Sequence, residues 1–360
     1  MSSIPKFDPQ ELTVVSESPS MMGRPGVPIY KFPVSMKEGV FAAHSRKPIW
    51  QLTGVESQYF APKVNPDNTA RAFVMDGSGF GFGQGGGPDM FGIEWEYVQS
   101  AGGSMVRPGK PYMEDANDWE DLIKFPDLAT WDWAESEEIN KNFLSDDRFN
   151  SCWQQNGFFE RLISFMDFEG AAMAMLDEDQ RDAVKALFMK LADLYIDLFD
   201  EYLKRYPKLD GFYVHDDWGS QKETFFSPEL CAEVIVPAMR KLTDYIHSRG
   251  KSAELHSCGQ ILRQVPNMID AGWDAWGGQA MNDTHKIYEL YGQGILIGVI
   301  PTPFDPNETS EDAQRAAAKE YVDKFCDPKK PSIFNSYGAG SLTPAYRAEL
   351  YKLSRERYSS

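Results

Sequence analysis

The tripeptide His256-Ser257-Cys258 contains the two residue types best suited to binding a transition-metal ion. Imidazole and thiolate are both good zinc ligands, and a catalytic zinc site needs three protein ligands with one position left open. We therefore predict His256 and Cys258 as metal ligands, with the third ligand to be supplied elsewhere. The same tripeptide is also compatible with a hydrogen-bonded histidine beside a structural cysteine.

Two adjacent carboxylates, Asp216 and Asp217, follow a short apolar run and are the next candidates for chemistry. A carboxylate there could bind a metal, anchor a substrate or act as a general acid with a raised pKa, so we predict a catalytic role for this pair. Glu254 lies two residues before His256 on the same face of a strand, which predicts a supporting catalytic group. His215 is expected to pack against or orient a substrate.

One β-α-β unit must position these side chains. The runs 211–215 and 251–255 read as strands, and Ser227-Pro228-Glu229 between them has the cap, proline and acidic residue of a helix start. Apolar residues then recur at nearly helical spacing up to Gly250. Pro237 falls inside this helix and should kink it. The polar residues named above therefore follow the ends of two neighbouring strands.

Strands and helices alternate through most of the chain, with roughly eight candidate strands beginning at Pro48–Thr53. This alternation predicts an α/β fold, a (β/α)8 TIM barrel, whose active site lies at the carboxyl ends of its strands. A doubly wound sheet is the alternative, but no dinucleotide-binding fingerprint follows the first strand. We predict an N-terminal arm at 1–35, a single barrel domain at 36–360, and an inserted hairpin and loop region at 89–107. The glycine-rich stretch Gly77–Gly87 is expected to be a lid or a surface loop.

The composition of the chain limits the classes of partner that we expect it to bind. Among 360 residues, 36 are basic and 54 acidic, and the net charge of −18 argues against nucleic acid or an anionic membrane as a partner. The sequence contains no signal-peptide pattern and no apolar run of about 18 residues. Its four cysteines do not suggest a disulfide framework, so we expect a cytoplasmic protein.

Aromatic residues are frequent near the predicted mouth of the barrel, which favours a flat apolar ligand. We predict that the following residues contact the substrate: Trp50, Phe91, Trp153, His215, Trp218, Gln279 and Tyr337.

Several short segments of the sequence are distinctive in combination: D-M-F-G-I-E-W-E-Y (89–97), M-V-R-P-G (105–109), G-F-F-E-R (157–161), H-D-D-W-G-S-Q (215–221), S-P-E-L (227–230), L-H-S-C-G (255–259) and N-S-Y-G-A-G (335–340). Together they resemble the uroporphyrinogen decarboxylase superfamily, and within it the corrinoid-dependent methyltransferases. The resemblance implies a TIM barrel with its pocket at the carboxyl-terminal mouth.

Two departures from the family pattern decide the branch. The decarboxylases carry an arginine-rich motif after the first strand, whereas Trp50-Gln51-Leu52-Thr53-Gly54 has no arginine. The zinc methyltransferases use His-x-Cys and a later cysteine, and 337–339 (Tyr-Gly-Ala) stands where that cysteine is expected. By resemblance a zinc site at His256 and Cys258 would then be completed by one of four residues: Asp216, Asp217, Glu254 or Gln279.

The resemblance implies a methyltransferase that moves a methyl group from a small methylated donor, with a methoxylated aromatic favoured, to the cobalt of a separate corrinoid-binding protein. Zinc and the partner's cobalamin would be its cofactors. A metal-free decarboxylase with an aspartate as proton donor is the first alternative, and a non-catalytic barrel that binds a small molecule is the second. The sequence leaves a homodimer open.

Overall fold

The computed structural model describes residues 5–18, 26–81, 84–99, 103–336 and 342–359. The chain divides into two compact units, each assembled from separate stretches of sequence. The first unit comprises Met1–Gln58, Asp147–Phe149 and Asp274–Ser360, and the second comprises Tyr59–Asp146 and Asn150–Trp273. No helix among the described residues is long and apolar enough to span a bilayer.

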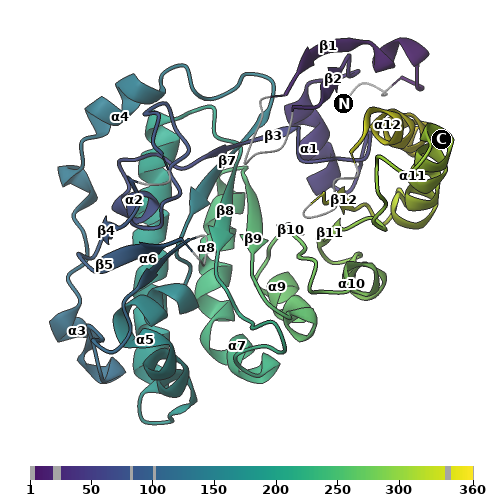
Figure 1. Ribbon diagram of the computed structural model, residues 1–360. Coiled ribbons are helices and arrows are strands. Elements are labelled where there is room, and N and C mark those ends of the chain that lie inside the picture. The colour runs from purple at the N-terminus through teal and green to yellow at the C-terminus, as the bar shows by residue number, and fades with distance from the viewer. Residues whose placement is uncertain (1–4, 19–25, 82–83, 100–102, 337–341, 360) are drawn as a thin grey trace. The chain divides into compact units, whose positions relative to one another are not determined.

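The second unit is built on the parallel strands β7 (Phe149–Gln154), β8 (Gly211–His215) and β9 (Ser252–His256), with β3 (Ser57–Phe60) next to β7. Figure 1 shows β7, β8 and β9 side by side. Gly211, Phe212 and Val214 are buried, as expected for a parallel strand with helices packed on it.

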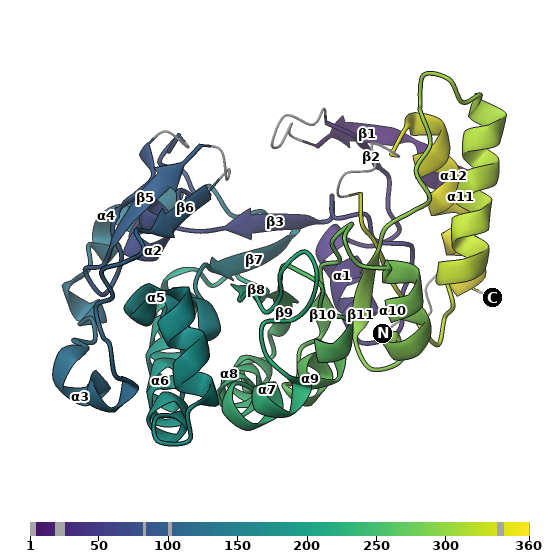
Figure 2. The same ribbon diagram turned by 60° about the horizontal axis from the view of Figure 1, so that its bottom comes forward.

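Helices of the second unit run along one side of these strands, as Figure 2 shows for α6, α7 and α8. The helices are α2 (Pro66–Ala70), α3 (Trp119–Leu122), α4 (Trp133–Asn140), α5 (Phe159–Leu176), α6 (Arg181–Arg205), α7 (Pro228–Val234), α8 (Val236–Ser248) and α9 (Val265–Asp270). The described 3₁₀ helices of this unit include η3 (Ala116–Asp118), η4 (Leu128–Thr130) and η5 (Leu262–Gln264).

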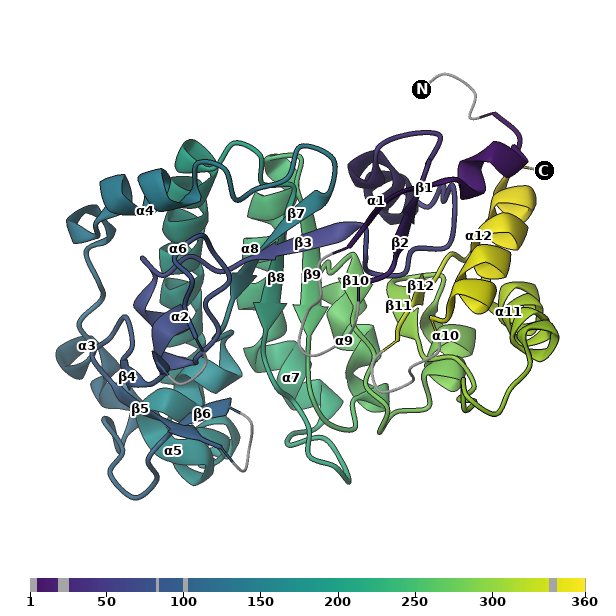
Figure 3. The same cartoon turned by 45° about the horizontal axis from the view of Figure 1, so that its top comes forward.

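The predicted insertion is a small antiparallel sheet in the second unit. It consists of β4 (Gly87–Pro88), β5 (Glu94–Val98) and β6 (Gly103–Val106), in that order. Trp95 of β5 is paired with Val106 of β6, and its side chain is buried. The inserted hairpin predicted from the aromatic-rich segment is therefore confirmed (Figure 3).

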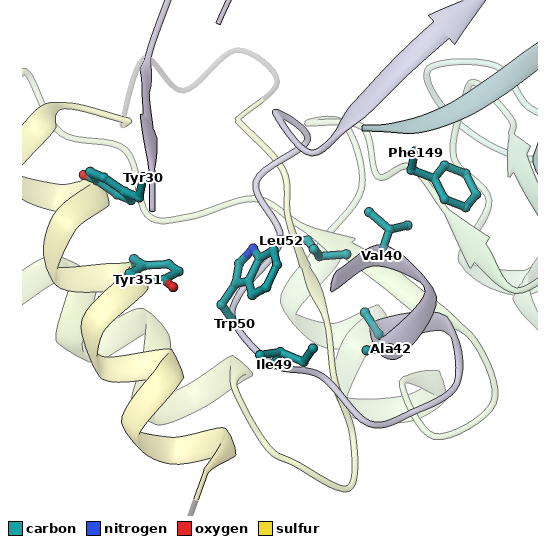
Figure 4. Packing of buried hydrophobic residues seen from close by; sticks show 9 residues of the cluster. Tyr30, Val40, Ala42, Ile49, Trp50, Leu52, Phe149 and Tyr351 are labelled. Carbon is teal, nitrogen blue, oxygen red and sulfur yellow. The ribbon is translucent and has the colours of Figure 1, made fainter. Parts of the chain in front are cut away.

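The first unit contains the parallel strands β10 (Ala275–Trp276), β11 (Leu296–Val299) and β12 (Ile333–Phe334). Its helices are α1 (Met36–His44), α10 (Thr284–Tyr291), α11 (Glu311–Phe325) and α12 (Pro344–Tyr358), and its other elements are η1 (Pro9–Leu12), β1 (Val14–Glu17) and β2 (Pro28–Tyr30). Trp50, Tyr30 and Tyr351 pack together in its hydrophobic core with Val40 and Ile49 (Figure 4).

Two local expectations are corrected by the structure. The stretch Pro48–Thr53 is not a strand, although the carbonyl of Leu52 accepts a hydrogen bond from the backbone N–H of Phe334 at 2.8 Å. The helix expected to kink at Pro237 is instead two helices, α7 and α8, because proline lacks the N–H that would continue the first one.

The described part of the predicted 1–35 arm contains η1 and the antiparallel pair β1–β2, and Glu11 forms a buried ion pair with Arg355 of α12 at 2.9 Å. The division into an arm and a domain at 36–360 stays a prediction. In both units parallel strands alternate with helices, so the predicted α/β class is confirmed.

Candidate metal centre

His215 and His256 end neighbouring parallel strands and are partners in the β8–β9 register. Parallel pairing turns residues in register to the same face of a sheet, so both imidazoles project from one face. Their rings stack with centroids 5.0 Å apart and an angle of 12° between planes. The register therefore brings together two histidines that lie far apart in the sequence.

Cys258 and Asp217 complete a cluster with these histidines. Nε2 of His256 lies 3.2 Å from Sγ of Cys258, and Nε2 of His215 lies 3.6 Å from Oδ1 of Asp217. The same Oδ1 accepts the backbone N–H of Cys258 at 2.6 Å, which ties the loop after β8 to the loop after β9. One potential ligand atom from each residue falls within 4.8 Å of all the others.

The four side chains fit a metal ion by their chemistry. Two imidazoles, a thiolate and a carboxylate are all established zinc ligands, and this mixture is harder than a set with two cysteines. All four residues are partly buried rather than exposed on the surface, where acidic groups often gather without a metal. This cluster, His215, Asp217, His256 and Cys258, is called the metal cluster below.

Two residues that the sequence did not predict contact the metal cluster. Oε2 of Glu160, in the first turn of α5, lies 3.1 Å from Nδ1 of His215. Nη2 of Arg71, at the end of α2, lies 3.0 Å from the same carboxylate oxygen. The guanidinium of Arg71 also stacks over the ring of Trp95, 5.0 Å from its centroid, so β5 of the insertion supports it.

The surroundings of the two histidines shift their pKa values in opposite directions. Burial alone would lower the pKa of His215, but the carboxylates of Glu160 and Asp217 outweigh it and raise the pKa well above its usual value. Burial lowers the pKa of His256 to about 3, and the neighbouring His215 adds to this effect. His256 is therefore neutral at pH 7, which leaves its ring able to bind a metal ion.

Asp216 lies outside the metal cluster although it is adjacent in sequence. It is fully buried, and its carboxylate accepts the backbone N–H of Glu160 at 2.9 Å and of Phe159 at 3.3 Å. The indole N–H of Trp218, also fully buried, donates to the same carboxylate at 2.9 Å. Burial raises the pKa of Asp216 to about 7 against these hydrogen bonds, which lower it. The structure thus places the two carboxylates in different environments.

Close backbone approaches hold the loops around the metal cluster. Gly259 follows Cys258 with φ of +88°, and a Cβ built there would lie 2.1 Å from the carbonyl oxygen of Gly219. A Cβ on Gly157 would lie 2.5 Å from Cβ of Asp216. Only glycine fits at these positions, so the glycine of L-H-S-C-G allows the loop after β9 to lie against the loop after β8.

A row of rings extends from the metal cluster across the same face of the sheet. Tyr213 lies 6.3 Å from His256 between ring centroids, and Trp153 stacks on Tyr213 at 4.3 Å. The indole N–H of Trp153 is buried and has no hydrogen-bond partner among the described residues. Glu254 pairs in register with Tyr213, and burial together with this carboxylate raises the pKa of Tyr59, whose ring packs on Trp153.

None of the other predicted substrate residues that the structure describes is a member of the metal cluster. Trp50 is buried in the core of the first unit, with its indole N–H bonded to Glu56 at 3.1 Å. Phe91 packs on Phe165 and Gln279 is buried in the first unit. Tyr337 falls outside the described residues. The substrate roles of all these residues stay predictions.

The sequence contained a weak signal for the missed residues. His215 and Glu160 are part of the segments H-D-D-W-G-S-Q and G-F-F-E-R, but nothing local shows that they meet. Arg71 follows a five-residue helix and has no motif of its own. Its place depends on the packing of α2 against the insertion, which a single sequence does not reveal.

Comparison with known proteins matches the chain to a family and to solved structures of similar fold. The family model for uroporphyrinogen decarboxylase (URO-D) matches residues 159–345, a segment that contains Glu160 and the whole metal cluster. A solved methyltransferase from Methanosarcina mazei has a similar fold, with a TM-score of 0.54 and 16% sequence identity over 91% of this chain and 100% of that one. No curated protein matches significantly. The matched family has the TIM-barrel fold, which agrees with the predicted barrel.

Proposed function

We propose, from the premise that the chain belongs to the uroporphyrinogen decarboxylase family, that it is a metal-dependent methyltransferase. The observation that carries this proposal is the metal cluster, in which His215 and Asp217 join His256 and Cys258. A decarboxylase that acts by donating a proton to its substrate needs no such set of metal ligands. The fold likeness to the Methanosarcina mazei methyltransferase is compatible with the proposal.

The metal is proposed to be zinc, held by His256, Cys258, His215 and Asp217. When bound, zinc would supply a Lewis acid for the oxygen from which the methyl group departs. Asp217 would also keep Cys258 in place, because its carboxylate accepts the backbone N–H of that residue. Since a catalytic zinc site keeps one position open for a ligand, one of the four side chains should be displaced when substrate binds.

The methyl donor is proposed to be a small methoxylated aromatic compound. Trp153 and Tyr213 present a row of rings beside His256, and aromatic side chains favour stacked or edge-on contact with an aromatic ligand. The buried indole N–H of Trp153 has no partner in the described part of the chain, and this supports a ligand role, because leaving a buried donor unpaired costs folding free energy. The ring row would orient the donor so that its methoxy oxygen reaches the metal cluster.

The methyl acceptor is proposed to be the cobalt of a separate corrinoid-binding protein. An ether oxygen is a poor leaving group, so transfer needs both a strong nucleophile and a group that stabilises the departing oxygen. The cobalt of the partner would be the nucleophile, and the metal cluster would stabilise the departing oxygen. The chain itself would contribute binding, orientation and exclusion of water.

The decarboxylase alternative has weaker support from the site. A proton donor must come within hydrogen-bond reach of its substrate, and Asp216 is fully buried with three N–H donors around its carboxylate. Release of carbon dioxide from aromatic acids in the absence of corrinoid protein would favour this alternative.

Metal analysis and a transfer assay test the proposal together. We expect about one zinc per chain in the purified protein, lost in His256→Ala and in Cys258→Ser. Cys326→Ser and His285→Ala, which alter residues of the first unit, should retain the metal. Wild-type protein should convert a reduced corrinoid protein to its methylated form, followed by absorbance, with at least one member of a methoxyarene panel. Metal-free wild-type protein, or no methylation with any donor, would count against the proposal.

A further inference from the structure

We infer that Glu160 and Arg71 are positioning residues for the metal cluster: the carboxylate of Glu160, held by Arg71, fixes the hydrogen of His215 on Nδ1 and turns the lone pair of Nε2 toward the other ligands. This inference rests on the metal site of the proposed function. It assigns roles to two residues that do not themselves belong to the cluster.

The contact between Glu160 and His215 determines the tautomer. A carboxylate can only accept hydrogen bonds, so Nδ1 of His215, 3.1 Å from Oε2 of Glu160, must carry the hydrogen. In the neutral ring Nε2 then has the lone pair. Nε2 lies on the side of Asp217, with 3.6 Å between Nε2 and Oδ1, so the lone pair faces the metal cluster.

Arg71 restrains the carboxylate rather than the imidazole. Its Nη2 donates to Oε2 of Glu160 at 3.0 Å, in an ion pair whose side chains are largely buried. Nη2 also lies 3.5 Å from Nδ1 of His215, but both nitrogens carry hydrogens in this arrangement, so that contact is not a hydrogen bond. Arg71 therefore acts on His215 only through Glu160.

The insertion and the helix α5 make this arrangement rigid. The guanidinium of Arg71 lies over the ring of Trp95, whose indole N–H donates to Asp89 at 3.0 Å. The backbone N–H of Glu160 is held by the buried carboxylate of Asp216. Both ends of the Arg71–Glu160 pair are thus anchored to buried groups, and a carboxylate that orients a ligating histidine in this way strengthens metal binding.

Competition with a chelator measures the effect without any need for enzymatic activity. We expect the zinc dissociation constant to rise roughly 10- to 100-fold in Glu160→Gln, which keeps the size of the side chain and removes its charge. Glu233→Gln is the matched control, because Glu233 forms partly exposed pairs with Lys185 and Arg181. It should bind zinc as the wild type does.

A double-mutant cycle separates positioning through His215 from a general structural role. In a His215→Ala background, Glu160→Gln should cause little further loss of zinc affinity, because the residue it orients is gone. If Glu160→Gln lowered zinc affinity by the same factor in the wild-type and the His215→Ala backgrounds, the inference would be wrong. The visible spectrum of the cobalt(II)-substituted protein should change in Glu160→Gln but not in Glu233→Gln.

A second variant keeps the test decisive if Glu160→Gln does not fold. Arg71→Gln should also weaken zinc binding. Arg71→Lys, which keeps the charge, should bind zinc more tightly than Arg71→Gln. Unchanged zinc affinity in folded Glu160→Gln or Arg71→Gln would contradict the inference while leaving the metal site intact. Absence of zinc binding by the wild type would instead overturn the metal site itself, and this inference with it.

Discussion

The carboxylate of Asp216 accepts the indole N–H of Trp218 at 2.9 Å, and both side chains are fully buried. Because the same carboxylate accepts the backbone N–H of Glu160, it links the loop after β8 to the first turn of α5. The residues on either side of Asp216, His215 and Asp217, are two of the four members of the metal cluster. Asp216 thus holds in place the chain segment that carries His215 and Asp217.

Asp216→Asn should therefore reduce stability. An amide presents its own N–H groups to three N–H donors, so at least one buried donor loses its acceptor, at a cost of roughly 1–3 kcal/mol in the free energy of unfolding. Urea unfolding measures this, with the exposed Asp182→Asn as a control. If Asp216→Asn instead kept its stability and lost methyl transfer, the predicted catalytic role of Asp216 would gain support over the structural one.

Alanine variants of two glycines separate the effect of a positive φ angle from the effect of a steric clash with a neighbouring loop. Gly259 and Gly250 both have positive φ, +88° and +68°, but only at Gly259 does an added Cβ meet other atoms. We expect Gly250→Ala to cost about 1 kcal/mol of stability and to leave zinc binding unchanged. Gly259→Ala must displace the backbone of Gly219 and should weaken zinc binding more than tenfold. Equal zinc affinity in the two variants would contradict this.

The parts of this arrangement that were predictable from sequence have local causes. Ser227 caps α7 by accepting the backbone N–H of Leu230 at 3.2 Å, and Pro228 occupies its first turn, as the residue types indicated. His256 and Cys258 stand together at a strand end because they are adjacent in the chain. Helix capping and strand periodicity depend on only a few neighbouring residues, so they can be recognised in a single sequence.

The parts that were missed depend on contacts between distant segments. The sequence predicts β8 and β9 as neighbouring strands, but it does not show the register that pairs His215 with His256. Trp50 is predicted to contact the substrate, a role that stays a prediction, and its ring stacks on Phe32 at 4.6 Å in a hydrophobic core. An aromatic residue in a sequence indicates burial, but it does not indicate which end of a strand the side chain will reach.

Replacing Arg161 by leucine should destabilise the second unit strongly. Arg161 is fully buried and pairs with two buried carboxylates, Asp89 at 2.6 Å and Asp67. Removing the guanidinium leaves two uncompensated negative charges, at a cost of roughly 3–5 kcal/mol in the free energy of unfolding. Because burial raises the pKa of Asp67, protonation neutralises that carboxylate more readily, and the loss should be smaller at pH 5 than at pH 8.

Urea unfolding of Arg161→Leu at both pH values tests this expectation. The matched control is Arg107→Leu, since Arg107 forms an exposed pair with Glu96 whose loss should cost less than about 1 kcal/mol. A loss in Arg161→Leu as small as that in the control would show that the buried pairs contribute no more than surface ones.

His44 should make the stability of the chain depend on pH. Burial lowers the pKa of His44 to about 4, with Arg46 adding to the effect and Asp274 opposing it. The unfolded chain, with a histidine pKa of 6.5, therefore binds a proton more readily than the folded one. The contribution of neutral His44 to the free energy of unfolding is fully present above its unfolded-state pKa of 6.5. It is lost as the pH falls from 6.5 toward 4, by up to about 3 kcal/mol.

His44→Gln removes this titration, so the difference in unfolding free energy between wild type and variant should shift steadily between pH 7.5 and pH 4.5. The wild type should lose stability relative to the variant as the pH falls, because only the wild type takes up a proton on unfolding. Other groups titrate equally in both proteins and cancel in the difference. A difference that stays constant over this range would mean that folding does not depress the pKa of His44, and that the ring beside Phe149 at 5.7 Å accepts its charge without cost.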